Sequence, residues 1–311
     1  VLGSDRALAV SCGLNPKYGD IDTYHSSASA IDEALRNLIA VGASLERAAL
    51  LDNFSWGNTR KPRQLGTLVR ATLACYDVAR AFGVPFVSGK DSLNNEFNTG
   101  EETIAIPPTL LISAIGVMEH ARHALSMDLK EPGNRLFIAG DTYPELGGSH
   151  YYDCHGLTGM TVPEVRPRTA RPTMEAISSA NRKGLLRACH DLSEGGLAVA
   201  AAEMAFAGGR GAELDLSAVP YRGPEKHRRD ELLLFSESNS RFLLEAAPEA
   251  VDPLQEIFGS LPLDPIGRVI EDPALTIAGL SGETAIKAKL NRLKAAWQQP
   301  LFPRHRAESS A

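Results

Sequence analysis

The chain contains 311 residues, of which 43% are hydrophobic and 23% are charged, and its formal net charge is -6. This composition is that of a globular protein long enough for two domains, and it lacks the basic excess of nucleic-acid-binding proteins. The longest apolar stretch, residues 107–118, is too short to cross a bilayer, so no membrane segment is expected. The four cysteines show no CxxC spacing, which argues against a zinc site or a disulfide framework and favours the cytoplasm.

The first 118 residues alternate strand patterns with helical patterns. Residues 1–11 are expected to form a hairpin remnant with a strand around Leu8 and Val10, and further strands are expected at residues 48–51, 85–87 and 109–118. Helical spacing predicts helices over residues 26–41 and 65–82, the second ended by Gly83. The stripe of the second helix that should face the core comprises Leu65, Leu68, Val69, Leu73, Tyr76 and Ala79.

Polar side chains accompany two of these elements. Glu33 and Asn37 stand four residues apart on the first helix and therefore share one face, either as solvated side chains or as a ligand pair. Asp52 follows the predicted strand at residues 48–51, and loops at strand ends often carry function. A purely structural loop is the alternative at Asp52.

The densest polar cluster is residues 85–96, PFVSGKDSLNNE. Gly89 allows close approach of a bound group, and Lys90 supplies an ammonium. Asp91 and Glu96 provide carboxylate oxygens, which suit magnesium. The cluster therefore predicts a phosphate and metal site, and a strand that runs into a polar hairpin is the alternative.

The pattern of strands and helices starts again at residue 135, after a polar segment typical of a domain joint. Strands are expected at residues 136–139, 185–189 and 242–245, and edge-like strands at 266–270 and 275–278. Helices are expected at residues 173–183, 198–207, 232–236, 251–258 and 283–297. We therefore expect domains at residues 1–128 and 129–299, followed by a disordered tail at 300–311.

Two glycine-rich turns in this second part are candidates for anion binding. Gly147 and Gly148 can expose backbone N–H groups to an anion, or they form a tight turn without a ligand. Asp191 and Ser193 follow a strand and precede a Gly-Gly pair and a helix. This arrangement predicts a metal-bound phosphate at the positive end of the helix, and a helix cap formed by Ser193 is the alternative.

Six stretches carry a family resemblance, in this order: NPKYGDIDTYHSSASAIDEALRNLIAVGA, ALLDNFSWGN, FVSGKDSLNNEF, LGGSHYY, CHDLSEGGLAVAAAEMAFAGG and LLFSESNSRFLLE. The chain resembles phosphoribosylformylglycinamidine synthase of the PurL type, a purine-biosynthesis ligase, and it matches the second half of that family. The resemblance implies an α+β fold. An N-terminal PurM-like domain, with a mixed sheet flanked by helices that forms half of a pseudo-dimeric barrel, should precede a C-terminal PurM-like α/β sandwich domain.

The resemblance also implies roles for residues of the catalytic site. Asp52 and Gly89 match positions that contact ATP, and Ser92 matches one that contacts the ribonucleotide substrate. Lys90 stands where the family has an asparagine that helps to hold magnesium. Because an ammonium cannot ligate a metal, Asp91 or a residue of the first half is expected to replace that asparagine.

A second, pseudo-symmetric nucleotide site is implied as well. Glu33, Asn37 and Asp191 match magnesium ligands in that site, and Ser193 matches a nucleotide contact. In the large form of the family this site holds a structural nucleotide that does not turn over. The expected cofactors are therefore ATP or ADP and Mg²⁺.

The implied reaction is the activation of an amide. ATP phosphorylates the formamide oxygen of formylglycinamide ribonucleotide, and ammonia from a glutaminase subunit or domain displaces the phosphate. The catalytic histidine of the family lies in the first half, so this chain alone should be inactive, with the first half of the same polypeptide as its partner. Two other functions remain open: a nucleotide-binding structural half without catalysis, and a self-sufficient homodimeric enzyme similar to aminoimidazole ribonucleotide synthetase.

Overall fold

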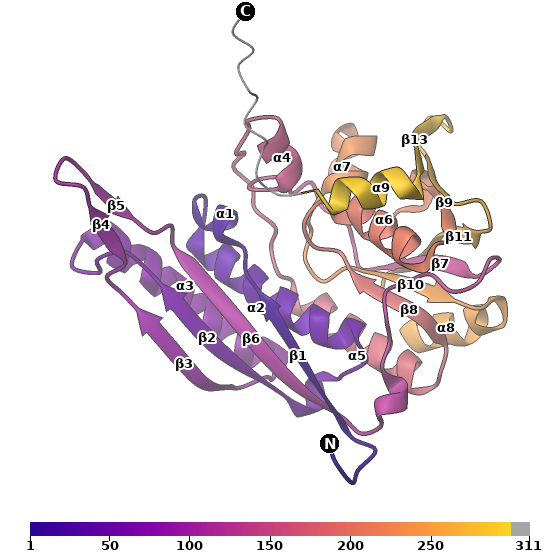
Figure 1. Ribbon diagram of the computed structural model, residues 1–311, viewed down its shortest axis with the longest axis horizontal. Helices are drawn as coiled ribbons and strands as arrows, with labels where there is room; N and C mark the ends of the chain where they lie inside the picture. The colour runs from indigo at the N-terminus through magenta and orange to yellow at the C-terminus, as the bar shows by residue number, and fades with distance from the viewer. Residues whose placement is uncertain (300–311) are drawn as a thin grey trace, which may run out of the picture.

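The computed structural model describes residues 1–299, which fold around two main β-sheets (Figure 1). The first sheet contains, in spatial order, β1 (Ala7–Gly13), β6 (Thr109–Met118), β2 (Ala48–Ser55) and β3 (Phe86–Ser92). Strands β4 (Glu96–Asn98) and β5 (Thr103–Ala105) form a separate hairpin. Because β2 pairs antiparallel with β6 and parallel with β3, the sheet is mixed and β3 is a free edge.

Three helices belong to this first sheet: α1 (Pro16–Gly19), α2 (Thr23–Ala40) and α3 (Pro62–Phe82). Helix α2 begins after Asp22, whose carboxylate accepts the backbone N–H groups of Tyr24 and His25 at 2.8 and 3.2 Å. Helix α3 ends at Gly83, which adopts φ +69°, a left-handed conformation that favours glycine. Both long helices predicted for this part of the chain are confirmed.

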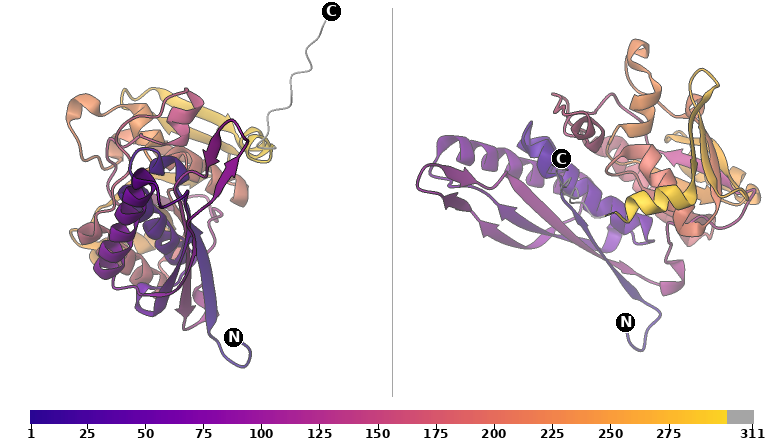
Figure 2. Two further views of the ribbon diagram at one scale, coloured as in Figure 1. Left: turned by 90° about the vertical axis from the view of Figure 1, so that its left-hand side faces the viewer. Right: turned by 45° about the horizontal axis from the view of Figure 1, so that its top comes forward.

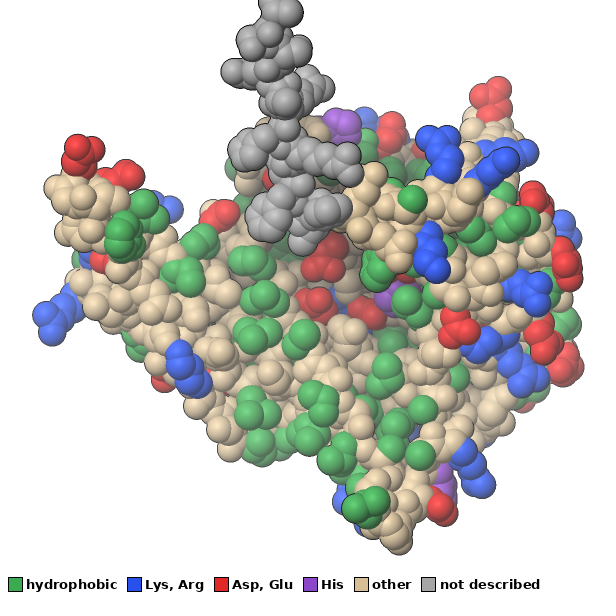
Figure 3. All heavy atoms as spheres, in the orientation of Figure 1, with side chains coloured by type: hydrophobic (Ala, Val, Ile, Leu, Met, Phe, Trp, Pro, Cys, Tyr) green, Lys and Arg blue, Asp and Glu red, His purple; other side chains and the backbone are tan. Residues whose placement is uncertain are grey.

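One face of the first sheet is covered and the other is open. Helices α2 and α3 cover one face, where Ile31 and Leu35 are buried with Leu50 and Ile112 of the strands. Figure 3 shows hydrophobic side chains gathered over the sheet on the side that faces the viewer. Four large apolar residues of its strands are exposed by 55, 73, 63 and 36%, namely Leu8, Val10, Val87 and Ile115.

The predicted core-facing stripe of α3 is wrong for four of its six members. Those four are exposed by 48 to 58%, namely Leu65, Val69, Leu73 and Tyr76, whereas Leu68 is half-buried against the core. The buried face consists mainly of small residues, namely Ala71, Ala74, Cys75, Val78 and Phe82. Small side chains let α3 approach the neighbouring helix α2 and the sheet closely, and this close contact decides which face of the helix is buried.

Strand β2 is longer than predicted. Its pairing with β6 continues from Ala48 opposite Gly116 to Ser55 opposite Thr109. Asp52 therefore lies within the strand and not in a loop after it. The polar side chains of this segment are compatible with a strand because the backbone of β2 is hydrogen-bonded to neighbours on both sides.

The second sheet has seven strands. In spatial order they are β13 (Thr284–Lys289), β12 (Ala274–Ala278), β9 (Gly211–Asp215), β11 (Leu263–Ile270), β7 (Arg135–Ala139), β10 (Phe242–Ala246) and β8 (Leu186–Asp191). Its helices are α4 (His150–Cys154), α5 (Pro167–Arg182), α6 (Gly196–Gly208), α7 (Asp230–Phe235), α8 (Val251–Phe258) and α9 (Leu290–Trp297). Short 3-10 turns occur at Leu45–Arg47, Ala121–His123, Leu216–Ala218, Glu225–His227 and Pro248–Ala250.

Helices lie on both faces of the second sheet, which makes this part of the chain an α/β sandwich. Helices α6, α7 and α9 share a core with one face, and α5 and α8 share a core with the other. Helix α5 also contacts α2 and α3, so the first core continues from one sheet to the other. Figure 2 shows the two sheets as separate units of the molecule.

Several predicted elements of the second part need correction. Helix α5 begins at Pro167, six residues earlier than expected, because proline is favoured at the first helical position. Strands β11 and β12 are interior strands and not edges. The predicted helix at residues 283–297 is half strand, because the alternating segment TAIKAK pairs with β12 before α9 begins. The tail predicted at 300–311 lies outside the described residues.

Within the described residues 1–299, no helix is both long and apolar enough to cross a membrane.

Candidate functional site

The residues predicted to bind nucleotide, substrate or metal fall into two groups. On β2 and β3 lie Asp52, Gly89, Asp91 and Ser92. Between α2 and the turn that joins β8 to α6 lie Glu33, Asn37, Asp191 and Ser193. The catalytic site and the second nucleotide site that the resemblance implies therefore lie in different parts of the structure.

Asp52 and Gly89 face each other across the parallel pair β2–β3. A Cβ atom at position 89 would lie 2.3 Å from Oδ1 of Asp52, so only glycine leaves room for this carboxylate as it is placed. Asp52 stands two residues from buried Leu50 and two from buried Phe54, so it shares their helix-covered face, as does Asp91, which is opposite Phe54. Burial and the charge of Asp91 raise the pKa of Asp52. Two neighbouring carboxylates of this kind fit a divalent cation such as Mg²⁺.

Ser92 and Lys90 lie on the open face of the same strand. Their register partners on β2 are Ser55 and Asn53, which alternate with the buried residues of that strand. The ammonium of Lys90 donates a hydrogen bond to Oγ of Ser92. Because β3 is the free edge of the sheet, a ligand that contacts both Gly89 and Ser92 must lie along this edge.

Glu96, an expected source of metal-binding oxygens, fastens a neighbouring loop instead. Its Oε1 accepts the backbone N–H of Asn58 at 2.9 Å, and both of its carboxylate oxygens accept hydrogen bonds from Nζ of Lys61 at 2.9 Å. These contacts fix the segment between β2 and α3 beside β4. The carboxylate is therefore used within the protein.

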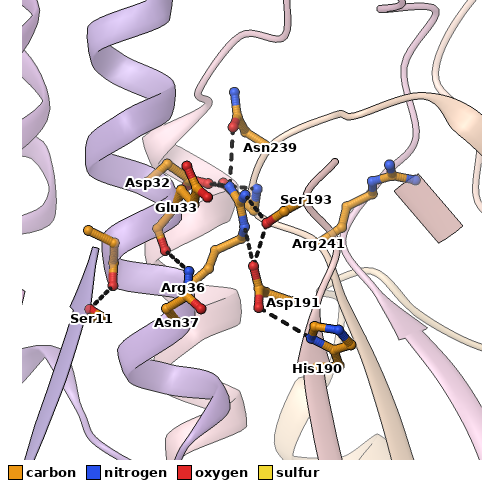
Figure 4. Close-up of polar contacts among 12 residues, drawn as sticks. Ser11, Asp32, Glu33, Arg36, Asn37, His190, Asp191, Ser193, Asn239 and Arg241 are labelled. Carbon is orange, nitrogen blue, oxygen red and sulfur yellow. Dashed lines mark hydrogen bonds and ion pairs between the residues drawn. The ribbon is translucent and has the colours of Figure 1, made fainter. Parts of the chain in front are cut away.

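The second group of predicted residues surrounds a buried arginine that the sequence patterns did not single out. Arg36 of α2 is only 3% exposed (Figure 4). Its Nη1 donates to the carboxylate of Asp32, one helical turn earlier, and to Oδ1 of Asn239 at 3.2 Å. Its Nη2 donates to Oγ of Ser193 at 3.1 Å, and its Nε lies 3.7 Å from Oδ2 of Asp191. One guanidinium thus connects α2 with two segments of the second sheet.

The two buried carboxylates beside Arg36 have further partners. Ser193 donates to Oδ2 of Asp191 at 2.5 Å and does not cap α6. Burial opposes ionisation of Asp191, but His190 and Arg36 outweigh this effect and lower its pKa to about 2. Asp32 accepts the backbone N–H of Ser240 at 2.9 Å and its hydroxyl at 2.5 Å. Ser240 has φ +61°, so Asp32 stabilises an unusual backbone conformation.

Glu33 and Asn37 lie on one face of α2, as the spacing predicts, but both are engaged within the protein. Oε2 of Glu33 accepts the backbone N–H of Leu14 at 2.9 Å and Nδ2 of Asn15 at 2.8 Å. Nδ2 of Asn37 donates to the backbone oxygen of Glu33 at 3.0 Å. Burial raises the pKa of Glu33 to about 7. Among residues 1–299, no three His, Cys, Asp or Glu side chains converge as metal ligands in either group. The internal hydrogen bonds of Glu33 and Asn37 make the fit of the second group to Mg²⁺ poor.

A further buried carboxylate occupies the start of α6. Oε1 of Glu237 accepts the backbone N–H groups of Gly195 at 2.9 Å and His150 at 3.0 Å, and its Oε2 accepts the hydroxyl of Tyr18 at 2.5 Å. Gly195 is the N-cap of α6. The backbone N–H of Gly195 at the positive end of this helix, where a phosphate is predicted, therefore already bonds an internal anion.

The glycine pair at positions 147 and 148 forms a turn whose N–H groups are used internally. Gly147 donates to the backbone oxygen of Thr161 at 2.8 Å, and Gly148 donates to that of Thr158 at 2.7 Å. Of the two alternatives for this pair, the structure has the tight turn.

Four residues of the interdomain contacts were missed by the sequence patterns. Asp32 and Arg36 carry a signal, since opposite charges four residues apart attract each other along a helix. Glu237 and its partner Tyr18 stand inside two of the six family stretches, but neither spacing nor composition predicts that they meet, because 219 residues separate them.

Two domain models of one family match most of the chain. The N-terminal domain of AIR synthase related proteins matches residues 1–118, and the C-terminal domain of AIR synthase related proteins matches residues 131–279. The chain belongs to this AIR synthase related family. The match confirms the predicted fold class.

Within the family, the chain is similar to PurL subunits of phosphoribosylformylglycinamidine synthase. It is 35% identical over 309 residues to the PurL subunit of Deinococcus radiodurans, which covers 97% of this chain and 40% of that protein. T. maritima PurL complexed with FGAR matches with a TM-score of 0.78 at 21% identity, over 93% of this chain and 46% of that one. T. maritima PurL complexed with ATP matches with a TM-score of 0.73 at 21% identity, over 93% and 44%. These findings confirm the predicted resemblance, and the chain spans less than half the length of these proteins.

Proposed function

We propose that this chain is one half of an ATP-dependent ligase, phosphoribosylformylglycinamidine synthase, in purine biosynthesis. The whole enzyme converts formylglycinamide ribonucleotide and ammonia into the amidine: the formamide oxygen takes the γ-phosphoryl group of ATP, and ammonia then displaces that group as phosphate. Similarity to PurL subunits and to the T. maritima PurL complexes with FGAR and with ATP supports this proposal. The four cysteines, all of them free thiols, agree with a cytoplasmic location.

The observation that carries the proposal is the contact between Asp52 and Gly89 at the free edge of the first sheet. Gly89 leaves the backbone of β3 open to ATP, and Asp91 with Asp52 would hold Mg²⁺, which neutralises phosphate charge. Ser92 positions the ribonucleotide from the open face. Lys90 adds a positive charge beside the Ser92 hydroxyl.

The open apolar face of the first sheet supports a partner half. Apolar side chains such as Val10, 73% exposed, and Val87, 63% exposed, lie on its strands with no cover from residues 1–299. An apolar surface of this kind is typical of an interface. We propose that the first half of the enzyme covers it and supplies the catalytic histidine, and that a glutaminase subunit or domain supplies ammonia.

Reconstitution tests the proposal. The chain is assayed for ADP release that depends on formylglycinamide ribonucleotide and ammonium, alone and mixed with the part of the D. radiodurans PurL subunit that it does not match. We expect turnover only in the mixture, with ammonium replacing glutamine. Turnover by the chain alone would contradict the proposal and favour a self-sufficient homodimer.

A matched pair of variants tests the partner surface. Val10→Asp should abolish turnover in the mixture, because it places a charge in the covered interface. Leu73→Asp, at an apolar residue of α3 that is 52% exposed, should leave turnover unchanged. Equal activity of the two variants would locate the partner elsewhere.

A structural half that binds nucleotide without catalysis is the second candidate, with the nucleotide held at the edge of β3. A nucleotide that binds only the folded chain raises its melting temperature. Stabilisation by Mg-ADP together with an inactive mixture would favour this candidate.

A further inference from the structure

The guanidinium of Arg36 lies among the side chains that the family resemblance assigns to Mg²⁺ (Figure 4). We propose that Arg36 is the resident cation of this interdomain cluster, so that the cluster binds neither Mg²⁺ nor a nucleotide phosphate. The inference does not rest on the proposed function, because it concerns α2 and the β8–α6 turn and not the edge of β3.

Two buried carboxylates already lie beside the positive charge of Arg36. Asp32 and Asp191 are 0 and 4% exposed, and both lie beside the guanidinium, with Nε 3.7 Å from Oδ2 of Asp191. A Mg²⁺ ion binds carboxylate oxygens at about 2.1 Å. An ion ligated by Asp191 would therefore lie within a few ångströms of a permanent positive charge, and their repulsion is strong in a poorly solvated site.

The other two predicted metal ligands, Glu33 and Asn37, are already hydrogen-bonded within the protein. Glu33 accepts two N–H donors from the loop at Leu14 and Asn15, and Asn37 is held by the backbone of α2. These contacts fix both side chains without a metal. A metal would have to break them or bind only the remaining oxygens.

The start of α6 is already next to a buried carboxylate, that of Glu237. A phosphate bound beside Ser193 would approach the N–H groups at the start of α6, of which that of Gly195 donates to Glu237 and that of Gly196 donates to the backbone oxygen of Ser193. The carboxylates of Glu237 and Asp191 also repel a phosphate at this place. The charge of Arg36 is already matched by Asp32 and Asp191: its Nη atoms donate to Asp32, Asn239 and Ser193, and its Nε lies 3.7 Å from Oδ2 of Asp191 without a hydrogen bond.

Titration with Mn²⁺, followed by electron paramagnetic resonance of the free ion, tests the inference on the 311-residue chain. We expect Glu33→Gln to bind as much Mn²⁺ as the unsubstituted chain, with the same affinity. Asp91→Asn reports separately on the site at β3, so loss of that site leaves the inference intact. An affinity at least tenfold weaker in Glu33→Gln would overturn it.

Removal of the guanidinium gives the complementary test. Arg36→Gln should gain one Mn²⁺ site, because Asp32 and Asp191 then lack their cation, and Arg36→Gln/Asp191→Asn should lose that site again. A folded Arg36→Gln chain without the extra site would contradict the inference. If Arg36→Gln does not fold, the comparison of the unsubstituted chain with Glu33→Gln decides the matter.

Discussion

Replacement of Arg36 by methionine removes the positive charge of the interdomain cluster while keeping most of the side-chain volume. The buried carboxylates of Asp32 and Asp191 then lose their common partner. Loss of one member of a buried ion pair typically costs about 3–5 kcal/mol. With an unfolding entropy of roughly 2.1 cal/mol/K per residue, the 299 described residues give about 0.63 kcal/mol/K. The expected fall in melting temperature is therefore about 5–8 °C.

Two further variants separate charge from geometry at Arg36, with melting followed by scanning calorimetry. Arg36→Lys keeps the charge but loses the bonds to Ser193 and Asn239, so it should cost about 2 kcal/mol, at roughly 1 kcal/mol a bond. Asp32→Asn/Arg36→Met removes both charges of the pair and should be more stable than Arg36→Met alone. A loss below about 1 kcal/mol in Arg36→Met would refute the buried ion cluster.

Three other predictions concern the nucleotide site, the start of α6 and the faces of α3. Gly89→Ala should displace Asp52, weakening Mg-ADP binding about tenfold in thermal-shift titrations, whereas exposed Ser88→Ala should not. Burial alone would raise the pKa of Glu237, but hydrogen bonds from His150, Gly195 and Tyr18 hold it below 4.5. The ionised carboxylate of Glu237 therefore contributes to stability above pH 4.5, and this contribution is lost as the pH falls through the lowered pKa. In Glu237→Gln, the free energy of unfolding measured in urea should depend less on pH in this acidic range. An unchanged pH dependence would contradict this prediction. Leu73→Gln should change stability by less than about 0.5 kcal/mol, whereas Ala74→Gln should cost more than about 2 kcal/mol; equal losses would contradict the assigned faces.

The sequence predicted the long helices of the first part and most strands, but it missed β9 and β13 and the faces that the elements bury. Local signals mark the ends of the helices, such as Gly83 after α3. Helix α3 carries one stripe of large apolar residues, including Leu65 and Leu73, and another of small ones, including Ala71 and Ala74. Size alone favours the wrong stripe. The correct one follows from the close approach of α2, which is a tertiary constraint that no local pattern contains.

The sheet site was predictable in its residues and not in its geometry. Polar density at residues 85–96 indicates a site, and the six stretches assign Asp52, Gly89 and Ser92 to it. Only the parallel register of β2 and β3 shows that Asp52 and Gly89 are in contact while Ser92 points to the opposite face. Register depends on partners far along the chain, so periodicity within one strand does not determine it.

The same limit explains why Arg36 was overlooked. In isolation, Asp32 and Arg36 form an ordinary helical pair worth about 0.3–0.5 kcal/mol, which solvent would screen. Burial changes its importance, and the residues that bury it, Asp191 and Asn239, follow more than 150 positions later. A spacing of four residues predicts that two charges meet. Whether they form a surface pair or the cation site of a domain interface depends on which segments cover them, and the second sheet provides that cover.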